Sequence, residues 1–352
     1  MEPDGVRESV LLAGLTTLGV GGAARWLVPW RDAAQLRAGL AFAAQRRVPW
    51  WLLGGGSNVI VADAGLPGVV LQPTGTNLDV VGQTAETQTV AADAGLAWDA
   101  LVAWTVSRGL GGIECLSGIP GLVGSAPIQN IGAYGQDVAE VIAQVEVLDT
   151  ASGRAGALSL TECAFGYRDS ALKRAPGRWI VTRVWLRLHV NAAPCLKYAQ
   201  LADALAETVL PPGAVGLERV RETVLQLRRA KGMVVDPEDP DSHSVGSFFI
   251  NPLVDTQTAD AVRARLAGAD AMPTWRAGDR VKLSAAWLIE HSGMHRGFGT
   301  GRVGLSTKHT LALVNRGGAT AVEVLAFADE VATRVHAACG VPLQREPVLL
   351  GF

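Results

Sequence analysis

Apolar residues recur at the spacing of an α-helix in several parts of this sequence. The clearest case is residues 32–47, where Leu36 and Leu40 fall on one face. Asp32 is placed to cap the amino end of this segment, and Pro49 bars its continuation. The pattern therefore predicts an amphipathic helix near the amino end of the chain.

Three further helices are expected from the same periodicity. One begins near residue 98, and Gly109 can take the left-handed conformation that ends it. Another covers residues 217–231, with apolar residues on one face and arginines opposite. The last begins at a capping box at Thr320 and stops at Gly340.

Short β-rich runs between these helices predict strands. Many of the 41 glycines cluster between positions 14 and 135, and strands are expected again near 143–149 and 179–190. Residues 236–241 read Asp-Pro-Glu-Asp-Pro-Asp, a segment too polar to pack and placed like a domain boundary. A second α+β module would then fill residues 242–340. The whole pattern predicts an α+β protein.

Composition narrows the class of protein. A chain of 352 residues has room for two or three modules, each with its own core. Lys and Arg number 31 against 33 Asp and Glu, so no overall basic field draws the protein to nucleic acid. The four cysteines are widely separated, which favours a reducing compartment. Because the chain shows neither a secretory signal nor a membrane-spanning apolar run, we expect a cytoplasmic protein without membrane insertion.

Three glycine-rich stretches are the first indication of a cofactor-binding site. The first glycine loop, Gly-Gly-Gly-Ser-Asn at 54–58, can offer converging N–H groups to a pyrophosphate, since glycine leaves no side chain in the way. Alone, it could equally be a tight hairpin. The second glycine loop (117–126) and the third glycine loop (129–135) suggest a long, flat cofactor that lies across several turns. The alternative is three unrelated turns.

Two other motifs are rejected. Residues 19–24 fit the GxGxxA dinucleotide fingerprint, but Trp26 continues a strand-like run where a helix is required. His291 and His295 are four residues apart beside Glu290, in an order that is not HExxH and with no third ligand, so we expect a polar helix end and no metal site. No GxxxxGK[ST] motif supports ATP chemistry.

Three polar residues are candidates for chemistry, each beside an ordinary alternative. Arg168 lies between an aromatic residue and an acid, where a surface arginine or an Arg–Asp salt bridge is the ordinary interpretation. Ser247 lies between a glycine and two phenylalanines, which suggests a hydroxyl in a desolvated pocket, although serines that cap turns are common. Glu346 could equally be an exposed acid near the carboxyl end.

Together these stretches resemble the UDP-N-acetylenolpyruvoylglucosamine reductase family, from residue 16 almost to Phe352. The most specific segments are 54–58, 121–135, 166–170, 246–252 and 306–309. The resemblance implies a vanillyl-alcohol-oxidase-type FAD-binding fold of two α+β subdomains, followed by an α+β domain that binds the UDP-sugar. The implied divisions are 1–75 with 341–352, 76–231, and 232–340.

The resemblance further implies an oxidoreductase that uses NADPH and non-covalent FAD to reduce UDP-N-acetylglucosamine enolpyruvate to UDP-N-acetylmuramate for peptidoglycan. It implies a monomer whose partners are the UDP-sugar and NADPH. Ser247 matches the proton donor, and Arg168 and Glu346 match the charged residues that flank the enolate. Their separation in sequence fits a site built between domains.

The binding residues follow from the same matches. Positions on the FAD side are Gly54, Gly55, Gly56, Ser57, Asn58, Ser117, Gly118, Ile119, Pro120, Gly121, Gly124, Ser125 and Gly132. Positions on the substrate side are Tyr134, Tyr198, Lys231 and Asn251, where Tyr198 resembles the loop tyrosine of the longer subfamily. Residues 288–300 depart from the family pattern, which leaves the uridine contacts there undefined.

Two rival functions remain open at this point. One is a flavin oxidase of the same fold with another substrate; such enzymes with covalent flavin often use a histidine near the first glycine loop, whereas the first histidine here is His189. Flavin that stays in an acid precipitate would favour that rival. The other is a non-catalytic nucleotide-binding module, which NADPH oxidation dependent on the UDP-sugar would exclude.

Overall fold

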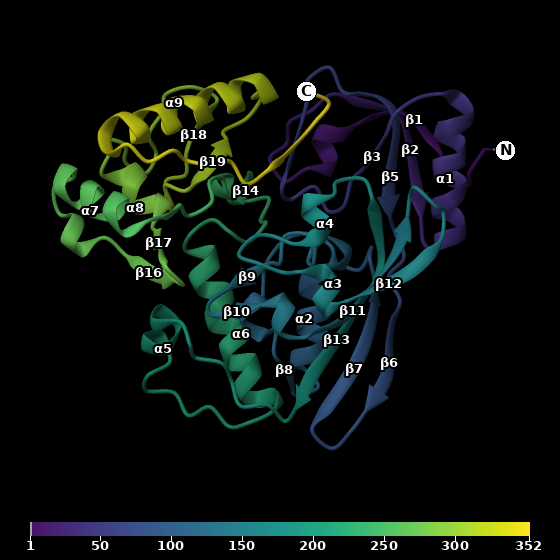
Figure 1. Ribbon diagram of the computed structural model, residues 1–352, viewed down its shortest axis with the longest axis horizontal. Coiled ribbons are helices and arrows are strands. Elements are labelled where there is room, and N and C mark those ends of the chain that lie inside the picture. Colours follow the sequence, from purple (N-terminus) through teal and green to yellow (C-terminus); the bar gives the residue numbers. More distant parts are fainter. Residues whose placement is uncertain (1) are drawn as a thin grey trace. The chain divides into compact units, whose positions relative to one another are not determined.

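The structure is a computed structural model that describes residues 2–352 and contains two compact units. Unit 1 comprises Met1–Val10, Ala24–Gly55 and Pro67–Arg229, and unit 2 comprises Leu11–Ala23, Gly56–Leu66 and Ala230–Phe352. Helices and strands are mixed in both units (Figure 1), so the predicted α+β class is confirmed.

The first sheet of unit 1 has four strands and one helix against it. In the order β1-β2-β5-β3, the strands are β1 (Arg7–Leu11), β2 (Ala23–Trp30), β5 (Leu66–Pro73) and β3 (Trp50–Leu52). Helix α1 (Ala33–Arg46) begins as predicted, because the Asp32 carboxylate accepts the backbone N–H groups of Ala34 and Gln35. Its residue Phe42 packs into a core with Trp26 and Trp30.

The second sheet of unit 1 forms its main layer (Figure 1). Its strands, in spatial order, are β12 (Ala155–Ser159), β11 (Ile142–Asp149), β13 (Trp179–Val190), β7 (Thr87–Asp93) and β6 (Leu78–Gln83), with β8 (Leu110–Gly111) paired to β13. The strands predicted near 143–149 and 179–190 are therefore confirmed. Helices α2 (Trp98–Val106) and α6 (Ala214–Arg229) share this core through Trp98 and Leu217.

The end of α2 corrects one expectation. Gly109 does adopt a left-handed φ of 68°, but the helix already ends at Val106, with Ser107 as its right-handed cap. Gly109 therefore turns the chain two residues beyond the cap. A side chain there would also lie near the backbone of Ala214 at the start of α6, at 3.1 Å.

The remaining elements of unit 1 are short. They are β9 (Gly132–Ala133), β10 (Gln136–Asp137), α3 (Leu160–Cys163), α4 (Ala171–Arg174) and α5 (Ala199–Ala204), with 3₁₀ turns η2 (Glu114–Leu116), η3 (Val123–Ser125) and η4 (Val138–Glu140). Turn η3 and strand β9 lie within the second and third glycine loops, and β10 and η4 follow directly after them.

Unit 2 combines two small sheets, a strand pair and three helices. The strands are β14 (Ser244–Ser247), β19 (Ala312–Asn315) and β18 (Val303–Leu305); β15 (Leu253–Val254), β17 (Arg280–Leu283) and β16 (Thr274–Ala277); and β4 (Val59–Val61), parallel to β20 (Val348–Leu350). The helices are α7 (Thr256–Arg265), α8 (Ala285–Glu290) and α9 (Ala321–Cys339), and the 3₁₀ turns are η1 (Leu12–Leu15), η5 (Pro240–Ser242) and η6 (Ala269–Ala271).

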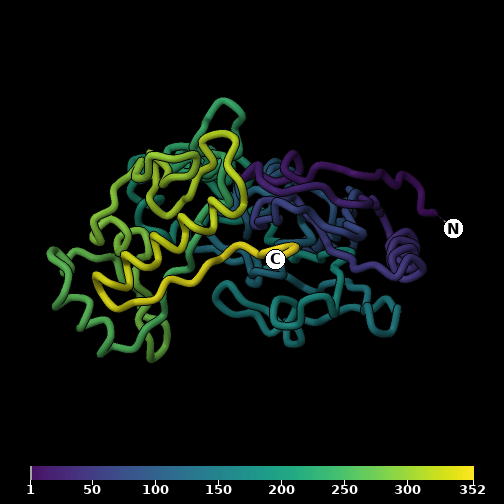
Figure 2. Tube along the Cα trace, turned by 90° about the horizontal axis from the view of Figure 1, so that it is seen from above, coloured from purple at the N-terminus to yellow at the C-terminus, as the bar shows by residue number. Residues whose placement is uncertain are grey.

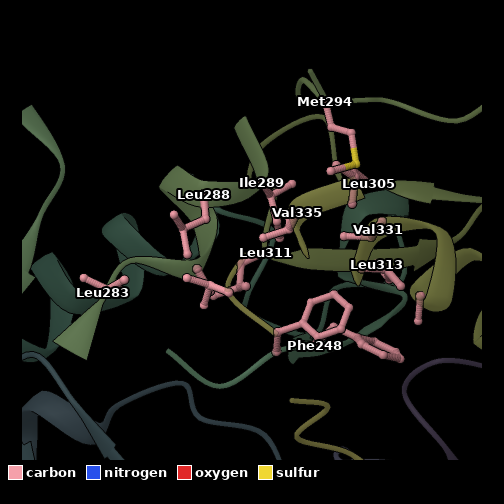
Figure 3. Close-up of a cluster of buried hydrophobic side chains, with 14 of the residues drawn as sticks. Phe248, Leu283, Leu288, Ile289, Met294, Leu305, Leu311, Leu313, Val331 and Val335 are labelled. Atoms are coloured by element: carbon pink, nitrogen blue, oxygen red, sulfur yellow. The ribbon is translucent and has the colours of Figure 1, made fainter. Parts of the chain in front are cut away.

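One apolar core holds unit 2 together. Figure 3 shows Phe248 against leucines of the sheet, with Val331 and Val335 of α9. Leu18 and Val20, from the amino-terminal part of the chain, belong to the same core. Helix α9 begins at the predicted capping box and ends at Gly340, which is left-handed. From there the chain runs extended to the carboxyl terminus (Figure 2).

The acidic segment 236–241 was expected to be too polar to pack; this is right for the exposed residues 236–238 and 240 but wrong for Asp241. Asp241 is only 5 % exposed, and its carboxylate accepts the backbone N–H of Thr307 at 2.8 Å and the Thr307 hydroxyl at 2.5 Å. Asp239 pairs with Lys308 at 2.8 Å. Burial opposes ionisation of Asp241, but the bonds from Thr307 outweigh it and hold the pKa of this carboxyl below its ordinary value.

Among residues 2–352, no helix is long and apolar enough to cross a membrane.

Candidate active site

The first and second glycine loops touch each other within unit 1. A Cβ placed on Gly55 would lie 2.7 Å from the Gly121 Cα, and one on Gly54 would lie 2.6 Å from the Ser125 hydroxyl oxygen. A side chain at Gly55 would require the backbone of the second loop to move, whereas one at Gly54 would require the Ser125 hydroxyl to rotate away. The two loops predicted to bind one cofactor are therefore close-packed. Strand β3 before the first loop pairs with β5 and strand β4 after it pairs with β20, so the first loop is not the tight hairpin of the alternative.

The second glycine loop is fixed by long-range bonds. Gly118 donates its N–H to the Asp99 carboxylate at 2.6 Å. Arg221 of α6 donates two hydrogen bonds, of 2.5 and 2.8 Å, to the same carboxylate. Gly124 donates to the Ala94 carbonyl at 3.0 Å. Burial opposes ionisation of Asp99, yet the Arg221 and Gly118 bonds prevail and lower its pKa.

The third glycine loop is shaped by Arg168. The Arg168 guanidinium donates to the Gly132 carbonyl at 2.8 Å and to the Asn130 carbonyl at 3.4 Å. Asp169, the acid next to Arg168 in the sequence, pairs with Arg174. A Cβ on Gly132 would overlap the Asp137 carboxylate.

Strained backbone gathers at this loop. Asn130, Tyr134 and Arg168 all have positive φ, at 43°, 49° and 53°, in a region that non-glycine residues adopt at a cost. Residues persist in such conformations only where the surroundings hold them, and they cluster at ligand sites. The positive φ values and the glycine pattern therefore indicate the same loop as a ligand site.

Tyr134 lies at the centre of an aromatic and cationic cluster in unit 1. Its ring meets Tyr198 edge-on, with the centroids 5.3 Å apart. Burial raises the pKa of Tyr134. The Arg228 guanidinium of α6 is buried nearby, and this burial lowers its pKa although Tyr134 and Asp99 partly offset the effect. Two predicted substrate residues, Tyr134 and Tyr198, are thus in contact.

These loops fit the group that the sequence suggested. Gly118, Gly121 and Gly135 have φ of 70°, 118° and 85°, in the left-handed region that glycine adopts without strain. Loops of this kind can present backbone N–H groups to a pyrophosphate, although the Gly118 N–H is already bonded to Asp99. Gly54 and Gly55 have no side chain, which allows the second loop to pack directly against the first. Ser117 is fully buried, and its hydroxyl donates to the Glu114 carbonyl at 2.6 Å.

In unit 2, Ser247 and Glu346 lie on neighbouring backbone segments. Phe249 and Arg345 form an antiparallel bridge, and the Glu346 N–H donates to the Phe248 carbonyl at 2.9 Å. Phe248 itself is fully buried in the core shown in Figure 3, which fixes the end of β14. Two of the three predicted catalytic residues therefore lie beside one rigid backbone contact.

Asn58, from the first glycine loop, joins this part of unit 2. Its side-chain amide donates to the Glu346 carbonyl at 3.4 Å, and its own carbonyl accepts the Val348 N–H at 3.0 Å. The bonds continue the pairing of β4 with β20. Arg168 belongs to unit 1, whereas Ser247 and Glu346 belong to unit 2.

The other predicted substrate residues of unit 2 are also tied to named neighbours. The Asn251 side-chain oxygen accepts the Ala285 N–H at 2.9 Å at the start of α8. Lys231 lies near His309, and burial, followed by the charges of Lys231 and Arg296, lowers the pKa of His309 to about 4. His309 is therefore a neutral side chain within a cationic region.

Sequence reasoning missed the residues that hold the loops. Asp99 and Arg221 fix the second loop, and Glu114 and Gln136 bond to each other at 2.8 Å beneath it. The only local sequence feature that could have indicated one of these residues is the position of Asp99 in the first turn of α2. Glu114, which is 1 % exposed, gave none.

The rejected motifs are also clarified. Residues 19–24 lead into strand β2, so no helix follows the fingerprint-like stretch. His291 caps the end of α8 and stacks on Trp287 at 3.5 Å, as expected of a polar helix end. Over residues 2–352, no three His, Cys, Asp or Glu side chains are grouped so that they could hold a metal ion.

Comparison with known proteins gives similarity over the whole chain. Residues 237–350 match the family model described as UDP-N-acetylenolpyruvoylglucosamine reductase, C-terminal domain, and residues 25–158 match the model described as FAD binding domain. A UDP-N-acetylenolpyruvoylglucosamine reductase from Thermobifida fusca is 45% identical over 98% of this chain and 98% of its own length. One from Streptomyces coelicolor is 46% identical over 100% of this chain and 92% of its own.

A solved structure agrees with these relatives. The crystal structure of UDP-N-acetylenolpyruvylglucosamine reductase from Thermus caldophilus is similar with a TM-score of 0.67 and 28% identity. The similarity covers 98% of this chain and 99% of that one.

Proposed function

The chain belongs to the UDP-N-acetylenolpyruvoylglucosamine reductase family, and from that premise we propose how its own residues perform the reaction. The protein is an FAD-dependent oxidoreductase that reduces UDP-N-acetylglucosamine enolpyruvate to UDP-N-acetylmuramate for peptidoglycan, with NADPH as the hydride donor. The proposal concerns which side chains bind, orient and protonate.

The three glycine loops would hold FAD. The close approach of Gly55 to Gly121 and of Gly54 to Ser125 supports this assignment, because both loops would present backbone amides to one pyrophosphate. The Asp99 carboxylate, fixed by Arg221, would keep the Gly118 amide in place. When bound, FAD supplies to the enolpyruvyl group the hydride that it receives from NADPH.

Arg168 and Glu346 would stabilise the charge that hydride addition leaves on the substrate. Addition at the terminal carbon puts negative charge on the adjacent carbon and its carboxylate. Arg168 can act as a fixed cation because two backbone carbonyls of the third glycine loop already orient its guanidinium. Glu346 can help when it carries a proton or acts through a bound water, since a bare carboxylate would repel the charge.

Ser247 would deliver the proton to the adjacent carbon. The observation that carries this assignment is the rigid contact of the Ser247 strand with the segment of Glu346, anchored by buried Phe248. A serine hydroxyl is a weak acid, so it needs a neighbour that stabilises the alkoxide or relays a proton. Tyr134, Tyr198, Lys231 and Asn251 would bind the UDP-sugar.

One experiment tests the proposal as a whole. The purified protein should show a flavin absorption spectrum that NADPH bleaches and that the enolpyruvyl UDP-sugar restores. A colourless protein that takes up no added FAD would contradict it.

We further propose three domains with the divisions 1–75 with 341–352, 76–231, and 232–340. The start of a separate C-terminal domain model at residue 237 supports a boundary near residue 232, although that model continues to residue 350, beyond the proposed end at 340. We also propose that the protein works as a monomer in the cytoplasm. Light scattering of the eluting protein would measure its mass, and a dimer mass would contradict the monomer.

A further inference from the structure

Two cysteines that lie far apart in the sequence meet in unit 1. The Cys115 thiol donates to the Cys195 carbonyl at 3.4 Å. Cys115 belongs to the turn η2, and Cys195 belongs to the segment between β13 and α5. Both are free thiols.

A buried network of hydrogen bonds fixes the backbone of both cysteines. The Glu114 carboxylate accepts the Cys195 N–H at 3.2 Å, and its other oxygen accepts the Gly112 N–H at 2.7 Å. Gln136 bonds to Glu114 and accepts the Cys115 N–H at 2.8 Å. The contact between the two cysteines therefore rests on fixed backbone at both positions.

The two thiols differ in access. Cys115 is fully buried, whereas Cys195 is half-buried and lines a pocket of about 660 Å³. The charged and titratable groups that face Cys195 there are Glu114, Glu140, His189 and Lys197. A small solute can thus reach Cys195 first.

The surroundings also favour a thiolate at Cys195. The Cys115 hydrogen bond, helped by the Lys197 N–H and outweighing burial and Glu114, lowers the pKa of Cys195 to about 6. The same hydrogen bond and burial raise the pKa of Cys115. By contrast, burial raises the pKa of Cys163 to about 11. Cys195 is therefore the thiol most readily ionised at neutral pH.

We propose that Cys195 and Cys115 form a thiol pair that hydrogen peroxide oxidises to a reversible disulfide. The Cys195 sulfur attacks one peroxide oxygen: an S–O bond forms, the O–O bond breaks, and the departing hydroxide takes a proton to become water. The Cys115 sulfur then displaces the oxygen of the Cys195 sulfenic acid, so an S–S bond forms and a second water leaves with the Cys115 proton. Peroxide gains the two electrons that the thiols lose.

The disulfide would join the segment that carries Cys195 and Tyr198 to the turn η2, which directly precedes the second glycine loop. Cys195 precedes Tyr198 by three residues, and Tyr198 packs on Tyr134. We therefore expect the oxidised enzyme to bind the UDP-sugar more weakly while NADPH still bleaches the flavin. This consequence rests on the proposed role of Tyr198, whereas the disulfide itself does not.

The test uses the purified holoenzyme treated with hydrogen peroxide near pH 7. Two of the four thiols should be lost, dithiothreitol should restore them, and digestion without reductant should yield a peptide that joins Cys115 to Cys195. Cys115→Ala should leave a sulfenic acid on Cys195 that dimedone traps. Cys163→Ala, a matched buried thiol, should behave like the wild type.

Absence of the joined peptide in the wild type, with oxidation at Cys163 or Cys339 instead, would overturn the proposal even if a variant failed to fold. Alkylation of Cys195 by iodoacetamide should reach half its maximal rate near pH 6, and a midpoint near that of an ordinary thiol would count against it. If the disulfide forms and the KM for the UDP-sugar is unchanged, the thiol pair stands and the expected weakening of UDP-sugar binding is wrong.

Discussion

A substitution at Ser247 should separate the two half-reactions, reduction of the flavin by NADPH and reduction of the enolpyruvyl group. A proton donor is needed only when the enolpyruvyl group is reduced, so Ser247→Ala should let NADPH bleach the flavin at a near-normal rate. Recovery of the absorbance on adding substrate should slow by about 10²- to 10⁴-fold, the usual contribution of a general acid. Stopped-flow spectra of each half-reaction measure both rates.

The conservative variant provides the control. Ser247→Cys should recover part of the lost rate, because a thiol can still donate a proton. If Ser247 only ends β14, both half-reactions should weaken together with stability, and a Ser247→Ala enzyme with normal recovery would remove this residue from the mechanism.

Lys231 is expected to act on binding alone. A cation placed on a substrate anion contributes equally in the ground state and the transition state, so Lys231→Ala should raise the KM for the UDP-sugar with little change in kcat. Bleaching by NADPH should be unaffected. Lys282→Ala, a lysine near Trp275 in the same unit, is the matched control. Slower bleaching with unchanged KM would place Lys231 near the nicotinamide instead.

Among elements, the paired glycine loops make the sharpest prediction. Gly55→Val should prevent FAD retention, because a branched side chain would collide with Gly121 and push the second loop away. Bound flavin per chain is the measurement. Gly156→Val is a suitable control, since Gly156 lies in strand β12 with open space around its Cβ position. Full flavin occupancy in Gly55→Val would show that the first loop is only a turn.

For the molecule as a whole, His309 predicts how stability depends on pH. Its folded pKa of about 4 lies below the ordinary 6.5, so the unfolded chain binds the extra proton first as the pH falls. Stability should therefore be fully present above pH 6.5 and decline between pH 6.5 and 4, by at most about 1.4 kcal/mol per pH unit. Urea unfolding at several pH values measures this.

His309→Gln tests whether the decline belongs to this side chain. The amide does not titrate, so the variant should lose less stability than the wild type over the same pH interval. Equal slopes for the two proteins would show that His309 is already charged, or accessible to solvent, in the folded state.

Local structure was largely decided by local sequence. Asp32 caps α1, Thr320 and Glu323 form the capping box of α9, and Gly340 ends that helix, because each of these bonds joins residues within one turn. The glycine loops were visible for the same reason, since their conformational freedom belongs to the residue itself. The family resemblance added residue roles that no local pattern contains, and those roles remain predictions.

Only the tertiary structure decided which distant groups meet. Arg221 reaches the carboxylate beneath the second loop, Asp241 is buried against Thr307, and the Asp63 carboxylate accepts the Ala321 N–H at 2.7 Å at the start of α9. The contact of Cys115 with Cys195 arises in the same way. The sequence shows only that these side chains are polar or ionisable. Their pKa values, and hence their protonation and chemistry, depend on burial, hydrogen-bond partners and nearby charges, which are set by the tertiary fold.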